Sequence, residues 1–222
     1  MNFDLFDAID DAVPAFEPLA EGAMLLRGFA LSMQAALIAD VHAVIAAAPL
    51  RHLVTPGGLR MSVATTNCGA LGWVSDRRGY RYRTTDPDSG QAWPAMPASC
   101  RALAVDAAAR AGFDGFAPDA CLINRYVAGT KLSLHQDRDE HDLRAPIVSL
   151  SLGLPAVFQF GGLKRADKTQ RVALRHGDVV VWGGASRLRF HGVLPLASGD
   201  HPLLGAQRIN LTFRRAGRLP DA

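Results

Sequence analysis

The alternation of apolar and polar positions changes character about halfway along the chain. In the first half, residues 31–48 (LSMQAALIADVHAVIAAA) repeat apolar side chains at helical spacing, and Pro49 stops the run. A second helical pattern covers residues 97–111 and closes at Gly112. We therefore expect two amphipathic helices, the first capped by Ser32, that support another part of the fold.

The carboxyl-terminal half contains short β-rich apolar runs separated by Gly, Pro or Asp. Their recurrence about every ten residues is typical of an antiparallel sandwich, jelly roll or barrel. The runs are CLINRYV, APIVSLSLG, AVFQFGG, RVALRHGD, VVVW, RFHGVLPL and RINLTFR. Residues 52–96 are rich in Gly, Pro, Arg, Trp and Tyr, and we expect hairpins and loops there that cover one face of the β core. No repeat or linker divides the sequence, which predicts a single domain over residues 1–222.

Composition places the chain among globular proteins. Hydrophobic residues make up 49% and charged residues 20%, which excludes disordered and fibrous classes. The formal net charge of +3 permits a polyanionic partner without requiring one. The acidic amino terminus lacks the basic region of a signal peptide, and no apolar run approaches the ~18 residues of a membrane span. We therefore expect a cytoplasmic protein, and we also expect a monomer. Cys68, Cys100 and Cys121 are odd in number and widely spaced, so we expect reduced, partly buried thiols.

His135 and Asp137 are separated by one residue in LSLHQDRDE, where a predicted strand ends. On an extended segment both side chains point to the same face, so they can chelate one metal ion. Alone the pair is a weak signal, because H-x-D occurs by chance. His191 ends a later extended run, whereas the other histidines fall in turns, polar connections or the polar side of the first helix. Two histidines and a carboxylate are the ligands of non-haem Fe(II) oxygenases, although manganese and zinc also bind such a set.

The strand RINLTFR gives a second signal, because all its polar residues fall on one face. These residues are Arg208, Asn210, Thr212 and Arg214. A solvated edge strand would show the same pattern. Beside a metal site, however, two guanidinium groups on one face suit the bidentate binding of carboxylates. In CLINRYV the same period-two alternation places Asn124 and Tyr126 on one face of the strand. A dicarboxylic cosubstrate would suit this set of arginines and polar side chains, and we therefore expect one.

Several motifs resemble those of the AlkB family of Fe(II)- and 2-oxoglutarate-dependent nucleic-acid demethylases. They are LINRY, LSLHQDRDE, IVSLSLG, FQFGG, HGDVVVWGG, RFHGV and RINLTFR, with TPGG and LGW upstream. The resemblance extends from about residue 15 to residue 216. It implies a mainly β, α+β fold in which a double-stranded β-helix (jelly roll) spans about residues 118–216. Supporting helices and a nucleotide-recognition lid over about residues 50–96 complete the expected domain.

The resemblance also implies roles for individual residues. His135, Asp137 and His191 match the family's iron ligands, and Trp73 matches an aromatic that stacks on the target base opposite His135. Asp139 matches a catalytic-site carboxylate beside the exocyclic amine of the base, with Glu140 close behind. The residues expected to bind the cosubstrate are Asn124, Tyr126, Arg208, Asn210 and Arg214. Those expected to touch the nucleic-acid backbone are Tyr80, Thr55 and Arg165.

The implied reaction is the demethylation of 1-methyladenine and 3-methylcytosine with Fe(II), 2-oxoglutarate and O2. The substrate would be single-stranded or damaged DNA, because a methyl group on the Watson–Crick edge is inaccessible in an intact pair, and RNA is left open as a further substrate. Formaldehyde, succinate and CO2 would be released. Two residues depart from the family pattern: Arg189 replaces an expected aromatic, and Thr65 replaces a bulkier apolar residue near the substrate groove.

Two other interpretations of the sequence stay open. A small-molecule dioxygenase on the same scaffold would keep the metal and cosubstrate residues but would not need Trp73 or a basic, aromatic lid. A non-catalytic nucleic-acid-binding module with a vestigial triad would keep the lid, although the intact ligand set argues against it.

Overall fold

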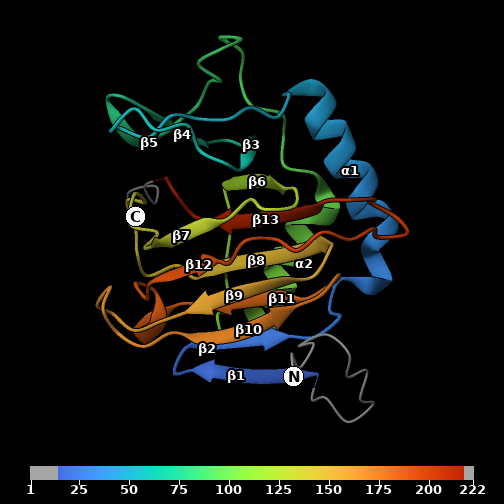
Figure 1. Cartoon of the computed structure of the whole chain (residues 1–222), viewed down its shortest axis with the longest axis vertical. Coiled ribbons are helices and arrows are strands. Elements are labelled where there is room, and N and C mark those ends of the chain that lie inside the picture. The colour runs from blue at the N-terminus through green and yellow to red at the C-terminus, as the bar shows by residue number, and fades with distance from the viewer. Residues whose placement is uncertain (1–14, 218–222) are drawn as a thin grey trace.

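Two antiparallel sheets lie face to face in the computed structural model, which describes residues 15–217 (Figure 1). The large sheet contains, in spatial order, β1 (Phe16–Ala20), β2 (Ala23–Leu26), β11 (Val179–Trp182), β8 (Ile147–Gly153), β13 (Arg208–Arg214), β6 (Ala120–Tyr126) and β3 (Ala64–Gly69). The small sheet contains β10 (Gln170–Leu174), β9 (Ala156–Phe160), β12 (His191–Val193) and β7 (Leu132–His135). This arrangement confirms the predicted jelly-roll fold, and each of the predicted β runs contributes a strand.

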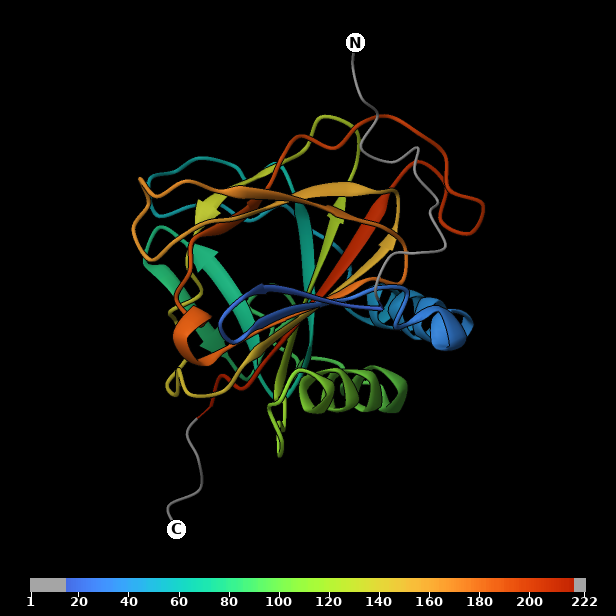
Figure 2. The same cartoon turned by 90° about the horizontal axis from the view of Figure 1, so that it is seen from below.

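The two predicted helices are confirmed as α1 (Gln34–Ala47) and α2 (Ala98–Arg110). Both lie on the same side of the sandwich, against the large sheet (Figure 2). The predicted Ser32 cap is wrong, because a 3-10 turn, η1 (Leu31–Met33), runs directly into α1 without a side-chain cap. In that turn the Met33 amide donates to the Ala30 carbonyl and the Gln34 amide donates to the Leu31 carbonyl, so backbone bonds serve two donors at the start of α1.

Residues 52–96 contribute more than loops. β3 becomes the edge strand of the large sheet, paired with β6, and a separate hairpin forms from β4 (Gly72–Asp76) and β5 (Gly79–Arg83). The hairpin lies at one end of the sandwich, above β3 in Figure 1. This segment therefore both extends the core and supplies a protruding element beside it.

The two faces of β13 lie in different environments, one apolar and one polar. Its apolar residues, Ile209, Leu211 and Phe213, join the core between this sheet and the two helices. Burying such a side chain stabilises the fold by about 1.5–3 kcal/mol. The alternate residues of the strand therefore face the space between the two sheets, where the polar side chains gather.

All three cysteines lie on the helix side of the large sheet and are free thiols. Cys68 and Cys121 are register partners on β3 and β6, and Cys100 lies on α2. They are fully buried rather than partly buried. Burial raises the pKa of Cys100 to about 12 and that of Cys121 well above its ordinary value.

No helix within residues 15–217 is long and apolar enough to cross a membrane.

Candidate metal centre and substrate cavity

The space between the sheets is open at one end and filled at the other. At the open end a cavity of about 870 Å³ is lined by side chains of β6, β7, β12, β13 and the β4-β5 hairpin. At the other end, apolar residues such as Leu25, Leu174 and Val180 fill the interior. The polar face of β13 belongs to the cavity, so the residue alternation of this strand places charged groups there.

His135, Asp137 and His191 come together in the wall of this cavity. His135 ends β7 and His191 begins β12, and the two are register partners in neighbouring strands. Asp137 lies just beyond β7, with its Oδ1 3.6 Å from His135 Nε2 and its Oδ2 3.8 Å from His191 Nε2. One ligand atom from each residue lies within 4.8 Å of the others, a spacing that a single metal ion could bridge.

Backbone carbonyls set the orientation of both histidines. His135 Nδ1 donates to the carbonyl of Ser133 at 2.9 Å, and His191 Nδ1 donates to the carbonyl of Arg189 at 3.0 Å. Because a carbonyl only accepts, each Nδ1 carries a hydrogen, and Nε2 is the nitrogen left to face the other members of the triad. Burial, followed by the neighbouring His135, lowers the pKa of His191 to about 4. Its imidazole is therefore neutral, as metal binding requires.

Arg214 holds the carboxylate of Asp137. Its Nε and Nη2 donate to Asp137 Oδ2 at 3.0 and 2.6 Å, and both residues are buried. Burial alone would raise the pKa of Asp137, but Arg214 and then the histidines outweigh it and hold that pKa below its usual value. Burial likewise acts to lower the pKa of Arg214, and Asp137 reverses the direction. The pair therefore keeps an ionised carboxylate in a buried site.

Arg208, at the other end of β13, has unmet hydrogen-bonding capacity. It is 1% exposed, stacks over the ring of Tyr126 at 4.9 Å and donates from Nη2 to Ser151 Oγ at 2.8 Å. Within residues 15–217, its Nε and Nη1 have no hydrogen-bond partner. A buried guanidinium with unpaired donors is costly, so an anion entering the cavity would be strongly favoured beside it.

The predicted cosubstrate residues on β6 and β13 form one wall of the cavity. Asn124 and Asn210 are register partners, and Tyr126 faces Arg208. Asn210 is already engaged, because its amide donates to Ser149 Oγ and to the Leu150 carbonyl. Asn210 therefore links β13 to β8 within the cavity wall, whereas Arg208 keeps donors that an incoming ligand could use.

The β4-β5 hairpin contributes an aromatic surface. Trp73 and Tyr80 stack with ring centroids 5.3 Å apart, and Trp73 Nε1 donates to Asp139 Oδ2 at 2.9 Å. The side chain of Asn67 on β3 exchanges two hydrogen bonds of 3.0 Å with the backbone of Trp73. The indole is thus fixed in position beside a carboxylate that has a second oxygen free for other partners.

Glu140 lies deeper than Asp139 and has no free carboxylate oxygen. Tyr82 donates to its Oε1 at 2.8 Å and Arg187 to its Oε2 at 3.0 Å. Arg214 approaches Oε1 at 3.3 Å. Glu140 therefore joins the hairpin, the loop after β7 and the strand β13.

The cavity lining also includes Thr55, Thr65 and Arg165, but not Arg189. Thr55 accepts a hydrogen bond from the Leu59 amide at 3.1 Å, and Arg165 donates to the Leu134 carbonyl at 2.6 Å. Thr65 lines the cavity with a buried hydroxyl that has no partner. Arg189 packs its guanidinium over Phe160 and donates to the Gly161 carbonyl, so it fills an aromatic's place by stacking.

Sequence patterns did not single out Asn67, Tyr82 or Arg187, although each contacts a predicted site residue. The one available signal for Arg187 was an arginine between Ser186 and Leu188 in a run of apolar and small residues. Asn67 and Tyr82 act through tertiary contacts that have no fixed spacing in the sequence.

A family model described as the 2OG-Fe(II) oxygenase superfamily matches residues 22–214. The Escherichia coli (strain K12) protein named alpha-ketoglutarate-dependent dioxygenase AlkB is 59% identical over 214 residues, covering 96% of this chain and 99% of that protein. The chain belongs to the AlkB family.

Other AlkB-family proteins show weaker but consistent similarity. The mouse nucleic acid dioxygenase ALKBH1 is 34% identical over 134 residues, covering 59% of this chain and 34% of that protein. The solved structure of OsALKBH1 superposes with a TM-score of 0.79 at 29% identity, covering 90% of this chain and 99% of that one.

The protein is thus an Fe(II)- and 2-oxoglutarate-dependent dioxygenase, and Fe(II), 2-oxoglutarate and O2 are what its family requires. The AlkB-family cavity has groups that fit them. Two imidazole nitrogens and one carboxylate form a ligand set that suits Fe(II). The unpaired donors of Arg208 suit a carboxylate group of 2-oxoglutarate.

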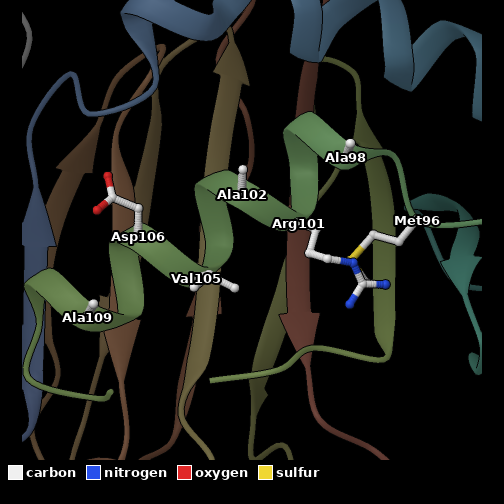
Figure 3. A pocket seen from close by; sticks show the side chains of 7 residues that line it. All are labelled: Met96, Ala98, Arg101, Ala102, Val105, Asp106 and Ala109. Atoms are coloured by element: carbon white, nitrogen blue, oxygen red, sulfur yellow. The ribbon is translucent and has the colours of Figure 1, made fainter. Parts of the chain in front are cut away.

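A second concavity, of about 670 Å³, lies on the outer face of α2, between Met96 and Ala109 (Figure 3). Its lining is mostly small apolar side chains and also includes Arg101 and Asp106, which lie between Ala109 and Met96 in Figure 3. It shares no lining residue with the interior cavity and lacks convergent polar groups, so the chemistry of this AlkB-family protein belongs to the interior cavity.

Proposed function

We propose that this enzyme removes N-methyl groups oxidatively from 1-methyladenine and 3-methylcytosine in DNA, preferably single-stranded, and also in RNA. One observation carries the proposal: a triad able to bind metal, an arginine that needs an anion, and an aromatic ring beside a carboxylate all line one cavity. The AlkB name of the E. coli relative and the nucleic-acid activity in the name of mouse ALKBH1 support it. The reaction would reverse alkylation damage directly.

Fe(II) with 2-oxoglutarate and O2 would supply the oxidising power to hydroxylate the N-methyl group, and the product would release formaldehyde, with succinate and CO2 as coproducts. His135 and His191 would hold the metal through Nε2, and Asp137 through its carboxylate. Arg214 would keep that carboxylate ionised and aligned. Arg208 would bind a carboxylate of the cosubstrate, with Asn124 and Tyr126 completing the wall.

The target base would stack on Trp73 after leaving the helical stack, with His135 on its other side. Asp139 has one oxygen occupied by the indole and one left to accept from an exocyclic amine. A carboxylate at this place favours 1-methyladenine and 3-methylcytosine, because both lesions are cationic and both carry such an amine. Tyr80, Thr55 and Arg165, at the cavity mouth, would contact the flanking backbone.

We also propose that the enzyme acts as a monomer, because one chain supplies the triad, the cosubstrate residues and the aromatic surface of this cavity, and that it acts in the cytoplasm. Light scattering at working concentrations, with and without oligonucleotide, tests the monomeric state. A stable dimer would contradict it.

The central experiment loads the protein anaerobically with Fe(II) and 2-oxoglutarate, then adds O2 and an oligonucleotide carrying one 1-methyladenine. Stoichiometric formaldehyde is expected, and the same oligonucleotide without the methyl group provides the control. Absence of formaldehyde from folded, iron-loaded protein would overturn the proposal. Oxidation of free metabolites without oligonucleotide turnover would instead favour a small-molecule dioxygenase.

A further inference from the structure

Arg187 is a buried arginine whose Nε, Nη1 and Nη2 all donate hydrogen bonds to one loop. It follows the short 3-10 turn η2 (Gly184–Ser186) and is 4% exposed. Its Nη1 donates to the backbone carbonyl of Asp137 at 2.6 Å, and its Nε donates to the carbonyl of Ala145 at 2.9 Å. Its Nη2 donates to Glu140 Oε2 at 3.0 Å.

The loop that receives these bonds lies between β7 and β8 and contains no helix or strand. Its backbone is therefore not held by a sheet ladder, although it carries Asp137 and Asp139. Arg187 joins the two ends of the loop, because Asp137 lies near its start and Ala145 near its finish. Arg187 thus links positions of the loop that no strand pairing holds together.

Asp137 is consequently held at two points. Arg214 binds its carboxylate from β13, and Arg187 binds its backbone carbonyl from the segment between η2 and β12. With the peptide and the carboxylate both fixed, the side chain has little freedom to turn away from His135 and His191.

The carboxylate of Glu140 lies between Arg187 and Arg214 and balances part of their positive charge. Its Oε2 pairs with Arg187 and its Oε1 with Arg214, and all three side chains are nearly fully buried. Removing one member of such a buried set is costly, whereas the intact set contributes little net stability. We therefore attribute this buried set of charges to a role in placing the loop rather than to a gain in the stability of the fold.

We propose that Arg187 is a positioning residue for the metal centre, which fixes Asp137 in register with the two histidines. This inference rests on the proposed metal-binding role of the triad. Lysine cannot substitute, because one ammonium group cannot reach three acceptors in the directions that a planar guanidinium serves.

The test compares Arg187→Lys with the parent protein by anaerobic titration with Co²⁺, whose visible absorption reports coordination number and symmetry. The variant should bind Co²⁺ about 10- to 100-fold more weakly, the range for residues that orient metal ligands, and with a changed spectrum. Arg144→Lys is the matched control. Arg144 belongs to the same loop but is exposed and pairs with Asp142, its one ion-pair partner among the described residues. Its affinity and spectrum should equal those of the parent.

A folded Arg187→Lys protein with the parent's Co²⁺ affinity and spectrum would overturn the inference. A merely structural role would lower the melting temperature while leaving the spectrum unchanged. If this variant does not fold, Glu140→Gln decides, because it keeps the shape but removes the charge that Arg187 pairs with. A smaller weakening in the same direction supports the role, and no change contradicts it. Failure of the parent to bind Co²⁺ would refute the proposed metal centre itself.

Discussion

The two ends of the sandwich interior differ in what their buried residues do. At the filled end, apolar side chains of β2, β10 and β11 pack against one another and stabilise the fold. At the open end, the same layers enclose arginines, carboxylates and histidines around a cavity. Burial at the filled end lowers the free energy of the folded state, whereas burial at the open end is costly unless each charge finds a partner.

Burial alone therefore does not identify the residues that stabilise this protein. Arg208 is as buried as Leu211 on the same strand, yet two of its nitrogens have no partner. Leu211 completes the helix-covered core. Substitutions on the two faces of β13 should therefore have opposite effects on stability and on ligand binding.

The largest effect is expected from Asp137→Ala, which removes the carboxylate from the triad. Demethylation should fall by at least about a thousandfold, equivalent to about 4 kcal/mol, because the metal loses a ligand and Arg214 loses its main partner. Formaldehyde release and Mn²⁺ binding measure the loss. Asp142→Ala, in the same loop but paired at the surface with Arg144, is the control. Parent-like turnover by the Asp137 variant would revive the interpretation of a vestigial triad.

Leu211→Ala should affect the opposite face of β13. A cavity in the helix-covered core should lower the free energy of unfolding by about 2–5 kcal/mol. The folded fraction should keep the parent's KM for 2-oxoglutarate, because this side chain faces away from the cavity. Urea unfolding and steady-state kinetics on one preparation provide both values. A large change in KM would show that the two faces of the strand are not independent.

Arg208→Met should give the reverse result. The KM for 2-oxoglutarate should rise about 10- to 100-fold, since a hydrogen bond to a charged group contributes about 1.5–3 kcal/mol. The free energy of unfolding without ligand should stay equal or increase, because a buried, incompletely paired charge is removed. Arg125→Met, an exposed arginine on β6, should change neither quantity. A destabilised Arg208 variant would contradict the contrast between the two faces.

The smallest effect concerns pH and the metal-free protein. Burial lowers the pKa of His191 to about 4, below the value of about 6.5 in an unfolded chain, so the unfolded state binds more protons between these values. Stability is therefore fully present above pH 6.5 and is lost as the pH falls towards 4. Between pH 6.5 and 5 the loss should be about 1–2 kcal/mol. Urea titrations at several pH values measure it, and His191→Asn should flatten the profile.

Much of this organisation could be predicted from local sequence patterns. The period-two alternation of RINLTFR identified both the apolar and the polar face of β13, and the spacing of His135 and Asp137 suggested their convergence. The β1-β2 hairpin was missed, because its strands are short and Pro18 interrupts the first of them. Nothing in the sequence distinguishes the exposed Asp139 from the buried Glu140, since their difference arises from Tyr82, Arg187 and Arg214, which are distant along the chain.

The buried cysteines gain a further meaning from the proposed chemistry. Methylating electrophiles that damage nucleic-acid bases also attack thiols, and they react with the thiolate form. Cys68, Cys100 and Cys121 lie behind the large sheet, and burial keeps the pKa values of the latter two far above neutrality. The enzyme therefore offers these agents no accessible thiol within its described residues, and should stay active under the same chemical exposure that creates its substrates.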